Sequence, residues 1–330
     1  EESIKSLITE KKKPYKHKSG FNPKLGKDPF GLNAYARELA MGLEEQESQF
    51  KVYLDMDGVI ADFEVTEAML RYFITKAYNR KPLVKPRIVI CVPNGITEVE
   101  KRAVRESAES AGAREVYLIE EPMAAAIGAD LPINEAKGSM IIDIGGGTTE
   151  IAIISLGGIV FSKSIRIGGN EFDNSIISYL KKNENIIVGE ITAEQLKIGI
   201  GSGIIPKHGD GKKMIVKGKE ITEGVPVERE ITERQVSESL AESLFEITEV
   251  ILEAFESAPP ELTSDIHENG ILLTGGGSLL SNMDIVIENA TGLKVQYAED
   301  PLSNVALGSG KVMKNLKSMK YMLSTPYGRH

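Results

Sequence analysis

Cysteine, tryptophan and long apolar runs are rare or missing in this sequence of 330 residues. The single cysteine, Cys91, lies in the apolar run 88–92. It has no partner for a disulfide, so we expect a buried thiol in the reducing cytosol. No apolar stretch approaches the roughly 20 residues of a membrane-spanning helix, and no signal-peptide pattern is found. A composition of 41% hydrophobic and 26% charged residues is typical of a soluble globular protein.

Charge further limits the possible functions. The net charge is −9, which argues against non-specific nucleic-acid binding as the main activity, so we expect no nucleic-acid partner. Residues 1–50 differ from the rest, with a basic cluster at 11–18 and a glycine- and proline-rich stretch at 19–31. Because this region has no periodic apolar face before about residue 32, we predict a poorly ordered basic arm.

Two glycine runs carry most of the functional information. Asp143–Glu150 reads Asp-Ile-Gly-Gly-Gly-Thr-Thr-Glu, and Leu273–Leu279 reads Leu-Thr-Gly-Gly-Gly-Ser-Leu. Each run follows a short apolar segment with the character of a strand. Glycines in this position let backbone N–H groups approach a phosphate without a Cβ in the way. Two such runs in one chain predict two halves that close on a nucleotide.

The apolar periodicity predicts alternating strands and helices. Strands are expected at 50–54 and 87–92, and three successive strands at 139–162. Thr97 and Glu100 form the sequence signature of a capping box, which predicts a helix to about residue 113. A second capping box at Thr232 and Gln235 heads a long predicted helix that ends before Pro259. The pattern indicates an α/β fold with antiparallel hairpins that feed a mixed sheet.

From Asp57 onwards the sequence resembles the MreB family of bacterial actin homologues. The motifs that carry this resemblance are 57–67, 95–102, 120–128, 143–150, 273–279 and 298–302. The resemblance implies an actin-like, ribonuclease H-like ATPase fold with two lobes. It implies that residues 51–138 are the remnant of a truncated first lobe and residues 139–330 the second lobe. A small outer subdomain is expected at about 178–231, and the C-terminal helix, about 304–330, is expected to return to the first lobe.

The resemblance also implies a binding site for ATP and Mg²⁺. The residues that it assigns to the nucleotide are Asp143, Gly145, Gly146, Gly147, Thr148, Glu194, Gln195, Leu196, Lys197, Gly275, Gly276, Gly277 and Ser278. Asp143 is expected to hold Mg²⁺ through water, and Glu121, with Thr148, to position the attacking water. Taken without the family, Glu121 is equally well a helix-start charge, and Glu194 with Lys197 is more often a surface ion pair.

The resemblance implies partners and a location as well. It predicts self-association into filaments and contact with cell-wall elongation proteins and with the inner surface of the cell membrane, on its cytoplasmic side. Leu83 and Val84 fall where the family carries an apolar loop that dips into the membrane. Two apolar residues contribute too little for stable anchoring alone, but a polymer multiplies a weak contact.

Two positions depart from the family pattern. Gly199 replaces a glutamate that the family usually has near the ribose, so nucleotide affinity is expected to fall. No Asp-x-Gly-Thr phosphate loop precedes Asp57, so nucleotide binding and hydrolysis are expected to be impaired. Residues 50–63 instead resemble the first motif of haloacid dehalogenase-like phosphatases, with Asp55 as nucleophile and Asp57 as proton donor. This suggests a junction between two genes at 57–63.

Three alternatives to an actin-like cytoskeletal ATPase follow from the residues. One is a phosphatase fragment that uses Asp55 and Asp57. Another is a sugar kinase or chaperone ATPase, which shares the two-lobed fold but needs additional domains or a sugar pocket. The last is a non-catalytic remnant that only binds partners. Binding of ATP by the folded chain distinguishes the last of these from the cytoskeletal ATPase.

Overall fold

The computed structural model describes residues 51–55, 63–78 and 85–323. Their contacts divide the chain into two compact units. Unit 1 holds the described parts of Glu1–Val92, Ile96–Ile119 and Val305–His330, and unit 2 holds Pro93–Gly95 and Glu120–Asn304. The segment from Val305 onwards therefore groups with the N-terminal unit. The lobe boundaries implied by the family resemblance, 51–138 and 139–330, and the subdomain at about 178–231 remain predictions.

Unit 1 is built on a three-stranded sheet in the order β1-β2-β3. The strands are β1 (Lys51–Asp55), β2 (Arg87–Val92) and β3 (Glu115–Glu120). β1 pairs with β2 in parallel, and the chain between them contains helix α3 (Phe63–Tyr78). A parallel pair needs such a crossover connection. Between β2 and β3 the chain forms helix α4 (Glu98–Ala111).

The capping box predicted at the start of α4 is confirmed. The Glu100 N–H donates to Thr97 Oγ1 at 3.2 Å, and the Thr97 N–H donates to Glu100 Oε2 at 2.7 Å. Gly112 ends the helix with φ +116°, a conformation that other residues rarely adopt. The apolar face of α4 is buried in the core of this unit. That core contains Leu70, Phe73, Ile88, Ile90, Val92, Val104, Ala108, Val116 and Leu118.

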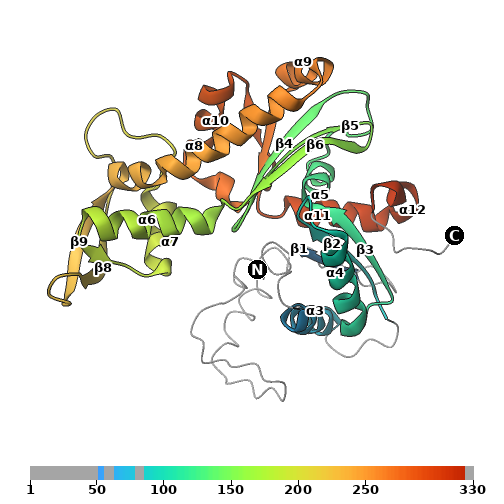
Figure 1. The fold of residues 1–330 in the computed structure, drawn as a ribbon, viewed down its shortest axis with the longest axis horizontal. Coiled ribbons are helices and arrows are strands. Elements are labelled where there is room, and N and C mark those ends of the chain that lie inside the picture. The colour runs from blue at the N-terminus through green and yellow to red at the C-terminus, as the bar shows by residue number, and fades with distance from the viewer. Residues whose placement is uncertain (1–50, 56–62, 79–84, 324–330) are drawn as a thin grey trace. The chain divides into compact units, whose positions relative to one another are not determined.

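Unit 2 contains a five-stranded mixed sheet in the order β11-β10-β4-β5-β6, of which Figure 1 labels β4, β5 and β6. These strands are β4 (Ser139–Ile144), β5 (Thr149–Ser155), β6 (Gly158–Ile165), β10 (Ile271–Thr274) and β11 (Val295–Tyr297). β4, β5 and β6 form an antiparallel meander, whereas β10 pairs in parallel with both β4 and β11. Every residue of β4 and β5 is buried, so this hairpin is the centre of the unit.

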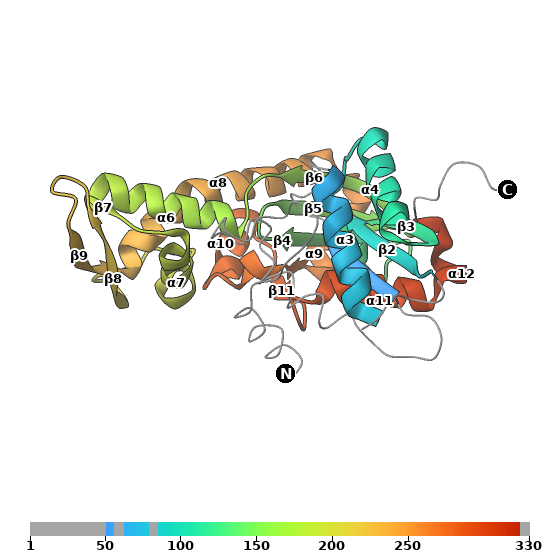
Figure 2. The same cartoon turned by 90° about the horizontal axis from the view of Figure 1, so that it is seen from below.

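A second, smaller sheet completes unit 2. It consists of β7 (Ile186–Ile187), β8 (Lys213–Glu220) and β9 (Pro226–Thr232), in that order and all antiparallel. The long helix α8 (Glu233–Ser257) connects the two sheets of unit 2. The small sheet lies towards one end of the helix and the five-stranded sheet towards the other (Figure 2). The capping box predicted at Thr232 is present, and α8 ends at Ser257 as the following prolines predict.

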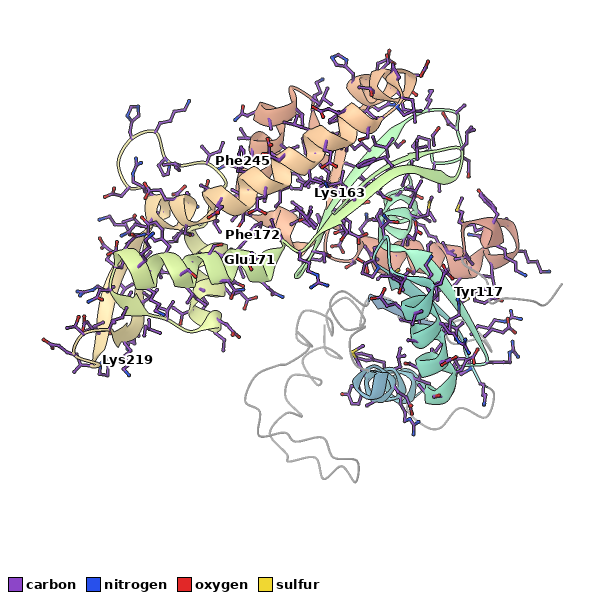
Figure 3. All side chains as sticks on the ribbon, viewed as in Figure 1. Tyr117, Lys163, Glu171, Phe172, Lys219 and Phe245 are labelled. Atoms are coloured by element: carbon purple, nitrogen blue, oxygen red, sulfur yellow. The ribbon has the colours of Figure 1, made fainter. Side chains whose placement is uncertain are left out.

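The remaining helices of unit 2 flank these sheets. They are α5 (Glu121–Gly128), α6 (Gly169–Asn183), α7 (Glu190–Ile200), α9 (Pro260–Asn269), the 3₁₀ turn η2 (Gly276–Leu279) and α10 (Met283–Thr291). α6 packs against α7 and α8. Phe172, near the start of α6, is fully buried in this core, whereas its neighbour Glu171 is exposed (Figure 3). One core is therefore shared by both sheets and by α6, α7, α8, α9 and α10.

Two helical segments differ from what the sequence analysis expected. Helix α9 was not predicted, yet it begins at Pro260. Proline stops a preceding helix but suits a first turn, whose N–H groups need no helical acceptor. The C-terminal helix expected over about 304–330 is, up to residue 323, divided into α11 (Asn304–Lys314), α12 (Leu316–Met319) and the 3₁₀ turn η3 (Lys320–Met322). The break falls at Asn315, whose Nδ2 donates to the Lys311 carbonyl at 3.0 Å.

The turn between β5 and β6 leads to a first prediction. Its two central residues, Leu156 and Gly157, have φ of +51° and +70°, as in a type I′ turn. Leucine is disfavoured there, and its side chain is 69% exposed, so little burial is lost on replacement. We expect Leu156→Asn to raise the free energy of unfolding in urea by about 1 kcal/mol. Leu156→Ala keeps the strain and should stay within about 0.5 kcal/mol of the wild type. Equal stability of the two variants would contradict this account.

Candidate functional site

The first glycine run forms the turn between β4 and β5, and we call residues Gly145–Thr148 the glycine loop. The Gly145 N–H donates to the Thr148 carbonyl at 2.8 Å, which closes the loop. Asp143 precedes it near the end of β4 and is 7% exposed. In the sheet, Asp143 lies beside Thr274 of β10 and Glu150 of β5. The loop therefore begins where parallel and antiparallel strands meet.

Gly146 lies at the exposed tip of the glycine loop. Its φ is not in the positive range, so its backbone conformation does not require glycine. A Cβ added there would meet only the side-chain amide of Asn170, at 3.9 Å. Neither backbone strain nor packing within the described residues therefore explains a glycine at this position. A glycine at this position leaves the backbone open to close approach by a ligand.

The start of α6 is hydrogen-bonded to the backbone of the glycine loop. The Gly169 N–H donates to the Gly145 carbonyl at 2.9 Å, and the Asn170 N–H donates to the Gly146 carbonyl at 2.7 Å. A Cβ on Gly168 would lie 2.7 Å from the Gly145 carbonyl oxygen, so this approach needs glycine. Asn170 is exposed beside Gly146 and was missed by the sequence analysis. The signal was a Gly-Gly pair, Gly168 and Gly169, at the start of a helix.

The second glycine run packs against the first. Gly275 has φ +86°, and a Cβ on it would lie 2.2 Å from Asp143 Oδ1. A Cβ on Gly277 would lie 2.6 Å from Ile144 Cγ2 and 3.0 Å from the Gly145 carbonyl oxygen. Two glycines of this run are therefore explained by contact with the end of β4. Gly276 lies beside Leu302, while Ser278 is fully buried and its hydroxyl donates to the Gly275 carbonyl at 2.6 Å.

Unit 2 buries four carboxylates: that of Asp173 on α6 and those of Glu121, Asp143 and Glu150. Glu121, the first residue of α5, is 5% exposed, Asp143 is 7% exposed and Glu150 is 1% exposed. Glu150 Oε1 accepts the Asn94 N–H at 3.0 Å. Within the described part of the chain, no three acidic, histidine or cysteine side chains are grouped closely enough to hold a metal ion. A single carboxylate, Asp143, fits Mg²⁺ bound mainly through water and nucleotide phosphates.

Helix α7 carries the residues expected beside the nucleoside. Glu194 and Gln195 are exposed, whereas Leu196 is fully buried in the core of unit 2. Lys197 forms its ion pair with Asp173 of α6, at 2.9 Å, and Lys197 Nζ also donates to the Gly169 carbonyl at 2.7 Å.

Two further positions of α6 and α7 bear on the same site. Burial raises the pKa of the Asp173 carboxyl, and the nearby Lys197 only partly offsets this effect, which Glu194 and Glu190 reinforce. Gly199 is exposed, and a Cβ there would lie 3.4 Å from Met214 Sδ. Other sequence predictions cannot be placed, since Leu83, Val84 and Asp57 lie outside the described residues and nothing is described of the Asp55 side chain.

Comparison with known proteins decides the family. A family model for the MreB/Mbl protein matches residues 48–321. The cell shape-determining protein MreB of Escherichia coli (strain K12) is 52% identical over 260 residues, which cover 78% of this chain and 74% of that protein. The chain belongs to the MreB/Mbl family. The match begins at residue 48 and so includes Asp55 and Asp57. The comparisons give no support to the predicted phosphatase start or to a junction at 57–63.

Solved structures support the same assignment. MreB5 of Spiroplasma citri, crystallised with ADP, has a TM-score of 0.75 and 37% identity, and the match covers 80% of this chain and 79% of that one. The same protein was also crystallised with AMPPNP. The MamK double helical filament has a TM-score of 0.65 and 20% identity over 83% of this chain and 78% of that one, a likeness of fold alone. The predicted actin-like α/β fold of this MreB/Mbl family member is therefore confirmed. Across the described residues, no helix has the length and apolar character to cross a bilayer.

Proposed function

We propose that this MreB/Mbl family member is a bacterial cytoskeletal protein that binds ATP with Mg²⁺ at the glycine loop. In this proposal it assembles with copies of itself into filaments at the inner face of the cell membrane and helps to determine cell shape. The carrying observation is Gly146, an exposed glycine in the turn after β4 that neither backbone strain nor packing among the described residues requires. Support also comes from a relative named for cell shape and from a structural neighbour crystallised with ADP.

The proposed chemistry assigns separate tasks to the residues around the loop. Backbone N–H groups of the glycine loop bind phosphate oxygens, as they do in other anion-binding turns. Mg²⁺, when bound, neutralises phosphate charge, and Asp143 holds its water shell. Glu121 orients the attacking water by accepting its hydrogen bond, with Thr148 as a second contact. Orientation and electrostatic stabilisation are most of what phosphoryl transfer requires of a protein.

Gly146→Ala tests nucleotide binding directly. The added methyl group has room in the described structure, so the free energy of unfolding should stay within about 0.5 kcal/mol of the wild type. A phosphate packed against the backbone would meet this methyl group. We therefore expect the Kd for ADP, measured by calorimetry, to rise at least roughly 10-fold. This corresponds to a loss of about 1.4 kcal/mol of binding free energy.

A matched control is Gly158→Ala at the start of β6. Gly158 is also exposed, lacks a positive φ and has room for a Cβ, whose nearest neighbour would be the Ser155 carbonyl oxygen at 3.8 Å. This variant should bind ADP as the wild type does. If Gly146→Ala also binds ADP with unchanged affinity, the glycine loop is not the phosphate site and the proposal fails.

A further inference from the structure

A continuous set of contacts joins α7 to the glycine loop. Lys197 Nζ donates to Asp173 Oδ2 at 2.9 Å and to the Gly169 carbonyl at 2.7 Å. Through its own N–H, Gly169 donates to the Gly145 carbonyl at 2.9 Å. Two of the three N–H donors of Lys197 are thus used on α6. One of their acceptors, Gly169, is also the residue whose N–H binds the glycine loop.

The carboxyl of this ion pair is buried and only partly hydrogen-bonded. Asp173 is 9% exposed, and its Oδ1 atom is buried without a hydrogen-bond partner among the described residues. The pKa of this carboxyl is raised in the folded state, chiefly by burial. A raised pKa means that the contribution of the carboxyl to stability is greatest below the unfolded-state pKa and is lost as the pH rises above it. Burial therefore works against the charged form of Asp173, as in many buried ion pairs.

We propose that Asp173 and Lys197 are positioning residues, which hold the start of α6 and thereby fix the shape of the glycine loop. The inference rests on the proposed nucleotide site and changes the role of one of its residues. In the resemblance, Lys197 lines the nucleoside. In this proposal, Lys197 holds Gly169 in place against the glycine loop. The lysine therefore affects phosphate binding rather than nucleoside binding. Asp173, which the sequence analysis did not select, orients the lysine.

Hydrogen exchange of the nucleotide-free protein tests the positioning role without any ligand. The variants are Asp173→Asn and Lys197→Met, each close in shape to the original side chain. We expect the amides of 144–149 and 168–173 to exchange at least 10-fold faster in both. Lys213→Met is the matched control, because it breaks an exposed ion pair with Glu230 elsewhere in unit 2. It should leave these amides unchanged. Unchanged exchange in Asp173→Asn and Lys197→Met would overturn the inference.

Nucleotide affinities then separate positioning from direct contact. A distorted glycine loop should weaken ADP binding about 10- to 100-fold, as expected for the loss of a charge-assisted hydrogen bond, and leave adenosine binding within about 2-fold. If Lys197 instead lines the nucleoside, the affinities for adenosine and for ADP should fall by the same factor. That result would overturn the inference. Lys197→Arg keeps the charge and should retain ADP binding within about 3-fold, whereas a purely steric role for the lysine would not allow this rescue.

Two further outcomes remain decisive. If the single variants do not fold, the double variant Asp173→Asn with Lys197→Met removes the unpaired buried charge and should fold. Its exchange rates and ADP affinity then decide the question by the same criteria. If the wild type binds neither ADP nor adenosine, the proposed function fails by itself. The exchange measurement still supports or overturns the positioning role in that case.

Discussion

Gly275→Ala is expected to destabilise unit 2 by about 3–5 kcal/mol, the largest effect of any single methyl group considered in this protein. Gly275 has φ +86° and ψ 156°, a region that only glycine populates readily, and this strain alone costs about 1–3 kcal/mol. The new Cβ would also lie 2.2 Å from Asp143 Oδ1 and 2.3 Å from the Ile144 carbonyl oxygen. Both neighbours belong to the buried strand β4, so relief requires movement of the central hairpin.

Urea unfolding of Gly275→Ala beside Gly292→Ala separates the two causes. Gly292 ends α10 with φ +71°, but a Cβ there would have nothing within 4 Å. This control should therefore lose only the conformational term, about 1–2 kcal/mol. If the two substitutions cost the same, the contact between the two glycine runs contributes nothing. The close approach of Gly275 to β4 would then need another explanation.

Glu121→Gln should lower the rate of ATP hydrolysis by about 100-fold or more while leaving the Kd for ATP within about 2-fold. The change keeps the shape of the side chain and removes its charge, so it acts on the orientation and polarisation of water rather than on binding. Glu121 is suited to this role because it is only 5% exposed and begins a helix whose residues are all buried. The expectation rests on the proposed function.

The neighbouring residue provides the control for this experiment. Glu120 ends β3 and precedes Glu121 directly, and it is half-buried. Glu120→Gln removes the same charge one residue away and should keep single-turnover hydrolysis within about 2-fold of the wild type. Equal losses in both variants would indicate a general electrostatic effect of this segment. An unchanged rate in Glu121→Gln would remove the residue from the proposed mechanism.

The sequence by itself determined the family, the class of fold and the local structure with strong signals. The capping boxes at Thr97 and Thr232 begin helices as predicted, because their reciprocal hydrogen bonds involve residues only three apart. Both glycine runs follow strands, as their apolar flanks indicate. The motifs that resemble the MreB family extend over most of the chain, which the family match at 48–321 confirms. Local patterns and motif order need no knowledge of contacts distant in the sequence.

Only the tertiary structure decided which residues meet at the site. Spacing along α7 pairs Glu194 with Lys197, yet the lysine binds Asp173, 24 residues away on another helix. The nucleotide contact of the second glycine run stays a prediction, but the packing of Gly275 and Gly277 against the end of β4 could not be read from the sequence. Asn170 reaches the loop only because α6 begins behind it. Such contacts depend on how distant elements pack, and helical or strand periodicity carries no information about the partner that a side chain finds.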